Sequence, residues 1–183
     1  MRPVPVIRAP TPIDAAAAAT LQARNWAVTY ASAFASAAVG RAIAADRRAH
    51  WERLLTGGPP DRGALVAELG GRIIGLVEWQ IGPDGDPTVG EVHALHVDPD
   101  AHRQGVGRAL LAAAAASLRD RGARRAFLWV LADNSSARAF YEHQGWPWDG
   151  TCVDRPLGGY PDLPSVTECR HARHLDGAIS PGT

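Results

Sequence analysis

The sequence predicts one mixed α/β domain. Its 183 residues are enough to bury roughly 70% of the surface of the unfolded chain. Segments with strand or helix patterning follow one another in the order β, α, α, β, β, β, α, β, α, β, β, and no internal repeat or low-complexity linker divides them. We therefore expect residues 1–175 to form a single domain and residues 176–183 to form a disordered tail.

The N-terminal third is expected to contain a short strand and two helices. Thr11 can cap the first helix, Pro12 suits its first turn, and Asp14 complements its dipole. Glycines and prolines over 57–60 end the second helix. The expected segments are a strand over Val4–Arg8, helices over Thr11–Tyr30 and Ala42–Leu55, and an irregular or helical connection over 31–40.

The middle of the chain predicts a hairpin, then a strand, a loop and a buried helix. Gly70-Gly71 is a two-residue turn signal between apolar segments. An alternating segment is then stopped by Asp98-Pro99, and a basic loop leads into an apolar helix that ends near Gly122. The expected strands are Ala64–Leu69, Arg72–Ile81 and Glu91–Val97.

The C-terminal third predicts three more strands and a short helix. Arg125–Leu131 is apolar on both faces, as an internal strand is. Asn134 can cap a helix that stops at Gly145. Trp148–Asp154 and Val166–His174 then form an antiparallel pair.

Composition excludes several classes of function. The formal net charge is zero, so no global field attracts nucleic acid or an anionic membrane. All nineteen basic residues are arginine, which excludes a Schiff-base lysine and a Walker lysine. No stretch has the roughly 18 apolar residues of a membrane span. Cys152 and Cys169 match no zinc or redox spacing, and we expect two reduced cysteines in a cytoplasmic protein rather than a disulfide.

The loop His102–Arg108 predicts an anion-binding site. The first N–H groups of a helix have no partner inside the helix, and the helix dipole places partial positive charge there. Gly105 and Gly107 allow close approach to the backbone, while Arg103 and Arg108 add full charge. These features indicate a ligand that carries phosphate but do not identify it.

Two stretches resemble the motifs of one family. Leu95–Leu111 resembles the acyl-CoA-binding motif of GNAT-type N-acetyltransferases, and Asn134–Trp146 resembles their Asn-x-x-Ala-x-x-x-Tyr-x-x-x-Gly-aromatic motif. The order of elements over nearly the whole chain is also that of the family. The resemblance implies a mixed, mostly antiparallel central sheet of about seven strands, flanked by about four helices, with a splay between the two central strands.

The resemblance implies acetyl-CoA as the acyl donor, with the pantetheine in the splay and the diphosphate on the loop. His102 stands where the family usually has arginine or glutamine, so we expect Arg103 or backbone N–H groups to take that role. The residues implied to bind the cofactor are Leu95, His96, Val97, Arg103, Gln104, Gly105, Val106, Gly107, Arg108, Asn134 and Tyr141.

Three residues are candidates for proton transfer. The motif places Tyr141 as the general acid for the thiolate, and a phenol with a pKa of about 10 is protonated at neutral pH. Glu91 is the leading base, with His93 or a water relay as alternatives; the two side chains share one face of a regular strand. The structural alternatives to these catalytic roles are that Tyr141 is a core residue, and that Glu91 and His93 lie on an exposed polar face of the strand. Asn134 is also expected as a helix cap.

The acceptor site is less defined by the sequence. Trp26, Tyr30 and Glu78 are candidate acceptor contacts, and Glu78 is also a third candidate base. Aromatic residues at helical spacing are more often core residues. His93, His96 and His102 match no metal-ligand pattern, and acyl transfer needs no metal, so no metal site is expected.

The resemblance therefore predicts a cytoplasmic, acetyl-CoA-dependent N-acetyltransferase that acts by direct transfer. The acceptor is expected to be a primary amine of a small molecule or a peptide N-terminus. A non-catalytic acyl-CoA-binding or sensing module is the alternative. We expect a monomer or homodimer that binds neither nucleic acid nor membranes.

Overall fold

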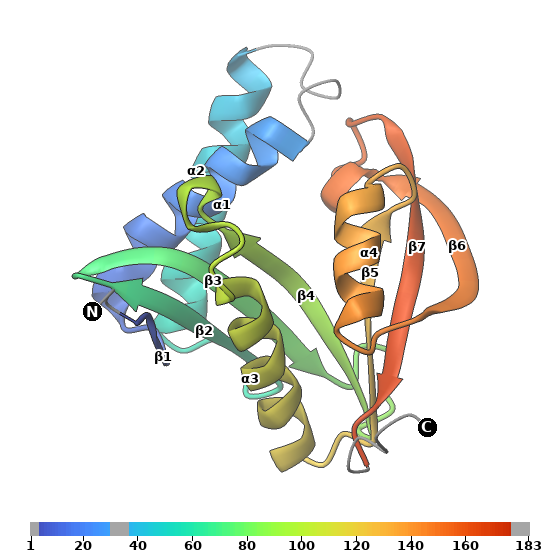
Figure 1. The fold of residues 1–183 in the computed structure, drawn as a ribbon. Coiled ribbons are helices and arrows are strands. Elements are labelled where there is room, and N and C mark those ends of the chain that lie inside the picture. The colour runs from blue at the N-terminus through green and yellow to red at the C-terminus, as the bar shows by residue number, and fades with distance from the viewer. Residues whose placement is uncertain (1–3, 30–36, 177–183) are drawn as a thin grey trace. The chain divides into compact units, whose positions relative to one another are not determined.

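The structure is a computed structural model that describes residues 4–29 and 37–176 (Figure 1). The predicted order of strands and helices is confirmed. Tyr30 and most of the predicted connection over 31–40 lie outside the described residues, as does the predicted tail after Asp176, while 37–40 belong to the second helix. The elements are β1 Val6–Arg8, α1 Ala15–Thr29, α2 Ala37–Leu55, β2 Arg62–Leu69, β3 Arg72–Ile81, β4 Val89–Val97, α3 Val106–Asp120, β5 Arg125–Leu131, α4 Ser135–His143, β6 Trp148–Pro156 and β7 Ser165–His174.

The seven strands form one open, mixed sheet in the order β1-β2-β3-β4-β5-β7-β6. β4 and β5 are parallel, with Val89 opposite Arg125 and Glu91 opposite Phe127. The pairs β1/β2, β5/β7 and β6/β7 are antiparallel. The prediction of a mixed sheet of seven strands with four helices is confirmed, and the splay between its central strands stays a prediction.

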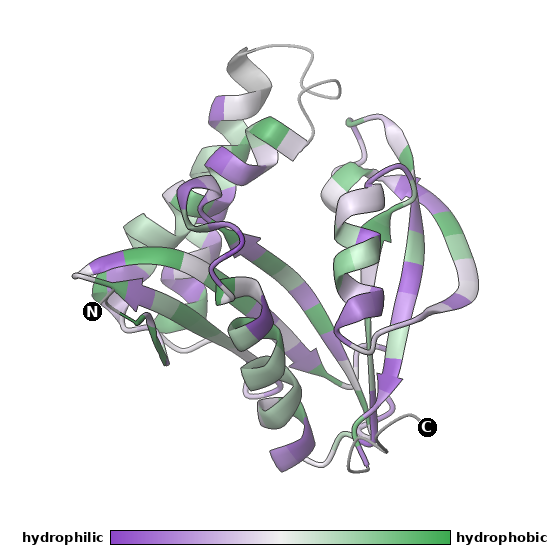
Figure 2. Cartoon of the chain, in the orientation of Figure 1, coloured by the Kyte–Doolittle hydropathy of each residue, from purple (hydrophilic) through white to green (hydrophobic). Residues whose placement is uncertain are grey.

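The loop before α3 and the helix itself differ in hydropathy. Figure 2 shows a hydrophilic loop before α3 and a mostly hydrophobic helix after it. This change follows the sequence, in which a basic segment precedes an alanine- and leucine-rich one. None of the described helices combines the length and the apolar character that crossing a membrane requires.

The chain divides into two compact units, each described by itself below. Residues 1–79 and 94–114 form the first unit, and residues 80–93 and 115–183 form the second. The prediction of a single domain over 1–175 stays a prediction.

In the first unit, a charged cluster holds the start of α1. The backbone N–H and hydroxyl of Thr11 donate to the carboxylate of Asp14 at 2.7 and 3.0 Å. Arg8 donates to both oxygens of Asp14 at 2.8 and 2.9 Å and to Glu68 at 2.7 Å. The hydrogen bonds from Arg8 hold the pKa of Asp14 well below its usual range. The helix predicted from Thr11 therefore begins as a 3-10 turn, Pro12–Asp14, before α1.

The core of the first unit lies between α1, α2 and the sheet. Small side chains on α1 allow the two helices to pack closely, which explains the alanine run of the sequence. Trp51 has no exposed surface, and its indole N–H donates to Gln22 Oε1 at 2.9 Å. The members of this core are Ala15, Ala18, Ala19, Leu21, Trp51, Val66 and Leu76.

The predicted hairpin turn is also confirmed. Gly70 and Gly71 have φ angles of 57° and 79°, and this left-handed pair matches the two-residue turn that connects twisted antiparallel strands. Further along β3, Gly75 allows a close approach to α3, because a Cβ atom there would meet Leu110 Cδ1 at 2.8 Å.

In the second unit, β5 is an internal strand, as predicted. Its residues alternate between buried Ala126, Leu128 and Val130 on one face and half-buried Phe127 and Trp129 on the other. β7 pairs with β5 along its whole length. Because β4 pairs with its other edge, β5 has a strand on each side.

The prediction of two reduced cysteines is wrong. Cys152 in β6 lies directly opposite Cys169 in β7, with Cα atoms 4.1 Å apart, and a disulfide joins them. Sequence spacing gave no indication of this bond, because the register of two strands decides which residues face each other. That register includes an irregularity between Trp148 and Cys152, which spacing does not reveal.

Candidate active site

In the first unit, β4 leads into a tightly fixed turn. The backbone N–H of Asp98 donates to the carbonyl of Ile74 at 2.8 Å. Its buried carboxylate accepts the N–H of Asp100 at 3.1 Å and so caps a short 3-10 turn, Pro99–Ala101. The predicted stop at Asp98-Pro99 thus ends the strand and aims the chain into the basic loop.

Two polar side chains of the loop contact the backbone that precedes it. His102 Nε2 lies 3.1 Å from the carbonyl oxygen of Val97, and Gln104 Nε2 donates to the carbonyl of Asp100 at 3.0 Å. The histidine that departs from the family pattern therefore supports the end of β4. Gln104, an expected cofactor contact, supports the turn that precedes the loop.

The start of α3 has the geometry of an anion site. The first bond of the helix runs from Ala109 N–H to the Gly105 carbonyl at 3.0 Å, so the N–H groups of the three preceding residues have no acceptor inside the helix. Gly105 has φ 81°, and Arg103 has φ 58° although it is not glycine. The side chains of Arg103 and Arg108 are exposed. This arrangement fits a diphosphate through backbone donors and two guanidinium groups.

The end of β4 carries the expected pantetheine contacts. Leu95, His96 and Val97 are half-buried. The carbonyl of Val97 accepts a hydrogen bond from Asn25 Nδ2 at 3.2 Å. Desolvation lowers the pKa of His96 to about 4, so its imidazole is neutral at pH 7.

Glu78 belongs to a buried polar network of the first unit. His50 Nε2 of α2 lies 2.5 Å from Glu78 Oε2, and Gln22 Nε2 of α1 lies 3.4 Å from Oε1. Trp26 is only 8% exposed, and the guanidinium of Arg47 lies 5.7 Å from its ring centroid. Sequence reasoning missed His50, because its carboxylate partner is on a strand distant in the sequence. Tyr30 lies outside the described residues.

In the second unit, Glu91 and His93 lie together, as strand alternation predicts. Glu91 Oε1 is 3.8 Å from His93 Nδ1, and Glu91 Oε2 accepts a hydrogen bond from Gln80 Nε2 at 2.7 Å. The side chain of Glu91 is 13% exposed and that of His93 is 50% exposed. Desolvation acts to raise the pKa of Glu91, but His93, Gln80 and the charge of Arg155 outweigh it and lower the pKa. Glu91 is therefore ionised at neutral pH.

The same face of the sheet carries four residues that sequence reasoning missed. Phe127 is opposite Glu91, and Trp129 follows it on the same face of β5. Arg155 of β6 lies over the Trp129 ring at 4.2 Å and forms a 2.7 Å ion pair with Glu168 of β7. Burial raises the pKa of Glu168, and although Arg155 opposes this, the charge of Glu91 adds to it. Only the register of the strands brings these residues together.

Helix α4 positions the second motif. Asn134 Oδ1 accepts the N–H of Ala137 at 3.1 Å, which confirms the expected helix cap. Tyr141 is half-buried, with its ring centroid 6.1 Å from that of His171. His171 is fully buried, and its Nδ1 lies 2.9 Å from the carbonyl of Trp146, the buried aromatic residue of the motif. The motif therefore has a structural part as well as a proposed catalytic one.

The histidines of the chain build no metal centre in the part that the structure describes. Among those residues, no three side chains of His, Cys, Asp or Glu come together in a group that could hold a metal ion. His93 pairs with Glu91, and His102 lies against a backbone carbonyl instead.

The chain thus combines an open mixed sheet with a helix start that has the geometry of an anion site. A model of the acetyltransferase (GNAT) family matches residues 23–146. The chain belongs to this family.

Several curated relatives are named mycothiol acetyltransferase. The protein from Cellulomonas flavigena is 38% identical over 127 residues, covering 66% of this chain and 36% of that protein. The protein from Salinispora arenicola is 51% identical over 63 residues, covering 34% of this chain and 20% of that protein. The chain thus spans about a third or less of the length of these relatives.

Solved structures share the fold. The PaiA N-acetyltransferase from Thermoplasma acidophilum, in complex with coenzyme A, superposes with a TM-score of 0.67 at 19% identity, covering 90% of this chain and 97% of that one. A GCN5-related N-acetyltransferase from Rhodopseudomonas palustris gives 0.69 at 23% identity, covering 95% and 98%. At these sequence identities, the similarity shows a shared fold and nothing more.

Proposed function

We propose that the chain transfers an acetyl group from acetyl-CoA directly to a primary amine. The observation that carries this proposal is the start of α3, where Gly105, free backbone N–H groups and two exposed arginines form a cradle for a diphosphate. The relatives named mycothiol acetyltransferase favour a small-molecule acceptor over a peptide N-terminus. When bound, acetyl-CoA supplies a thioester whose carbonyl carbon accepts the amine.

The residues proposed to bind acetyl-CoA contact different parts of it. Arg103 and Arg108 would face the phosphates, together with the backbone of Gly105–Gly107. Leu95–Val97 would line the pantetheine. Asn134 caps α4 through its Oδ1, so its side-chain amide nitrogen is the group proposed to contact acetyl-CoA.

A C–N bond forms and the C–S bond breaks in the proposed reaction. The protonated amine gives one proton to the base before it attacks and a second proton as the amide forms. The departing thiolate takes a proton from the Tyr141 hydroxyl, and the second amine proton restores that hydroxyl. The lowered pKa of Glu91 makes its carboxylate a weak base. We therefore propose that His93 accepts the amine proton and that Glu91 stabilises the resulting imidazolium from 3.8 Å.

Glu168 is proposed to attract the acceptor. Its carboxylate lies on the face that carries Glu91, in contact with Arg155. A protonated amine bound near Glu168 would gain an opposite charge close to the base. Trp26, Glu78 and Tyr30 remain proposed acceptor contacts.

The decisive experiment measures binding and turnover separately. Isothermal titration with acetyl-CoA tests donor binding, and release of free CoA thiol in the presence of a panel of amines tests transfer. Binding with turnover on a small amine supports the proposal. Binding without turnover on any amine would favour the alternative, a non-catalytic acyl-CoA-binding module, and no binding at millimolar acetyl-CoA would exclude both.

Tyr141→Phe tests the general acid. The variant keeps the ring that packs beside His171 but removes the acidic proton. We expect kcat to fall by roughly 10²-fold or more while KM changes little, because the proton is needed only as the thiolate leaves. An unchanged kcat would remove Tyr141 from this role.

The base is tested by the pH dependence of kcat/KM. If His93 accepts the proton, the acidic limb is that of an imidazole, whereas a Glu91 base would place the limb at or below the ordinary range of a carboxyl group, because the pKa of Glu91 is lowered. Glu91→Gln should then lower kcat and move this limb to lower pH, since the imidazolium loses its neighbouring charge. Glu168→Gln is the matched control on the same face, and it should raise KM and leave kcat nearly unchanged. An acidic limb in the carboxyl range that disappears in Glu91→Gln would make Glu91 the base instead.

A further inference from the structure

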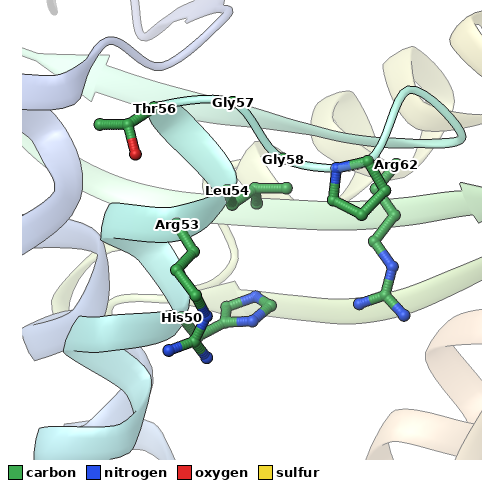
Figure 3. A pocket seen from close by; sticks show the side chains of 8 residues that line it. His50, Arg53, Leu54, Thr56, Gly57, Gly58 and Arg62 are labelled. Carbon is green, nitrogen blue, oxygen red and sulfur yellow. The ribbon is translucent and has the colours of Figure 1, made fainter.

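A cavity of about 510 Å³ lies at the C-terminal end of α2, within the first unit. Figure 3 shows that the last turns of the helix, the glycine-containing loop after it and the first residue of β2 line it. Its titratable lining residues are His50, Arg53 and Arg62, and none of its lining residues is a carboxylate.

The two arginines are not neutralised by neighbouring acids. Within residues 4–29 and 37–176, neither Arg53 nor Arg62 forms an ion pair or a side-chain hydrogen bond, and both are exposed. Glu52, next to Arg53, instead binds Arg48 at 3.0 Å. Asp61, next to Arg62, does not line the cavity. Two guanidinium groups thus face one cavity whose lining residues include no carboxylate.

The third titratable lining residue, His50, is held in place by a carboxylate outside the cavity lining. Glu78 fixes the His50 ring through Nε2, at 2.5 Å. Figure 3 shows the His50 ring beside the Arg53 side chain, with Arg62 reaching the same cavity from β2. At the helix end, Thr56 donates both its N–H and its hydroxyl to the Glu52 carbonyl at 3.1 and 2.7 Å, so this carbonyl is already satisfied.

We propose that this cavity binds the phosphate group of a small molecule. Guanidinium groups bind phosphate oxygens through two parallel N–H donors, and two of them match the two charges of a phosphate monoester. The cavity exceeds the size of a bare phosphate ion and falls in the range of small-molecule sites. This inference goes beyond the proposed acetyl transfer and does not depend on it.

The test uses the whole 183-residue chain and NMR signals of the side chains that line the cavity. The Nε–Hε resonances of Arg53 and Arg62 are followed by NMR while inorganic phosphate, glycerol 3-phosphate or glycerol is added at low ionic strength. Saturable shifts with glycerol 3-phosphate, and none with glycerol, support the proposal. A similar affinity for inorganic phosphate identifies the free ion as a sufficient ligand, whereas tighter binding of glycerol 3-phosphate shows that the cavity also holds the organic part.

Variants separate this cavity from the loop before α3. Arg53→Gln and Arg62→Gln should each weaken glycerol 3-phosphate binding roughly 10-fold or more, the usual effect of losing a hydrogen bond to a charged group. Arg41→Gln is the matched control, because it removes the same charge from an exposed position of α2 that does not line the cavity. Arg108→Gln removes a charge from the other anion site and should leave the cavity resonances and their titration unchanged.

Three results would overturn the proposal. The first is the absence of saturable shifts at Arg53 and Arg62, and the second is equal weakening by Arg41→Gln, which would indicate diffuse charge attraction. The third is equally tight binding of acetate. Since both arginines are exposed, their substitution should leave urea unfolding unchanged, and this measurement excludes loss of the fold as the cause of weaker binding.

Discussion

The disulfide between Cys152 and Cys169 should add about 3 kcal/mol to the free energy of unfolding. Its two cysteines are 17 residues apart in the sequence. For a loop of this size, the chain-entropy relation gives a loss of roughly 11 cal/mol/K in the unfolded state, or about 3 kcal/mol at 25 °C. The bond joins residues that already face each other in the β6–β7 ladder, so its contribution comes from restricting the unfolded chain.

Urea unfolding of three samples measures this contribution. They are the oxidised protein, the same protein with a thiol reductant, and the double variant Cys152→Ser, Cys169→Ser. Cys152 is exposed, so a reductant can reach the bond. We expect the reduced protein and the variant to unfold at the same, lower urea concentration, and the variant to be insensitive to the reductant.

A thiol assay decides whether the bond exists in solution. Protein purified without reductant should show no free thiols when it is denatured. Two free thiols, or an unfolding curve that the reductant leaves unchanged, would refute the reasoning. Disulfides persist mainly in oxidising compartments, so the thiol count also tests the expectation of a cytoplasmic protein, which assumed reduced cysteines.

Three further substitutions test the packing and charges of the first unit. His96 has a pKa of about 4 in the folded chain and about 6.5 when unfolded, so the wild type should lose about 3 kcal/mol relative to His96→Gln as pH falls from 7 to 4; an unchanged difference in urea unfolding would contradict this. Gly75→Val should destabilise by roughly 1–3 kcal/mol, because Leu110 leaves no room for a Cβ atom, and an unchanged melting temperature would exclude this close packing. Asp14→Asn should cost roughly 1–3 kcal/mol at pH 7 by breaking the paired contact with Arg8. Because the folded pKa of Asp14 is lowered, this cost should shrink progressively as pH falls below about 4 and the unfolded chain takes up a proton, and a cost that is the same at pH 2 as at pH 7 would contradict the ion pair.

Elements with strong local signals were predictable from the sequence. The Gly70-Gly71 turn and the Asn134 cap depend on the preferences of a few adjacent residues, and the structure confirms both. The strand Arg125–Leu131 has its predicted bounds, because turns limit a short apolar run at each end. The second helix begins at Ala37 rather than Ala42, since its first turn has no distinct capping signal.

The candidate site was predictable only where it is local. The basic loop before α3 is contiguous in sequence, and its positive φ at Gly105 follows from residue type. The contacts of Glu168 with Arg155, and of His50 with Glu78, join residues from separate elements. Strand register and helix docking bring such pairs together, and neither is encoded in a short motif.

The disulfide and the proposed acceptor residues depend on the same register. Cys169 pairs with Cys152, and the next residue back, Glu168, pairs with Val153 on the opposite face of the two strands. Arg155, two residues beyond Val153, shares this face and reaches Glu168 at 2.7 Å. A slip of one residue would turn Glu168 away from Arg155. The disulfide and this ion pair therefore depend on one register, which the β6–β7 ladder sets. Because the bond acts on the unfolded chain, its reduction should lower the stability of the protein but leave the KM for the acceptor nearly unchanged.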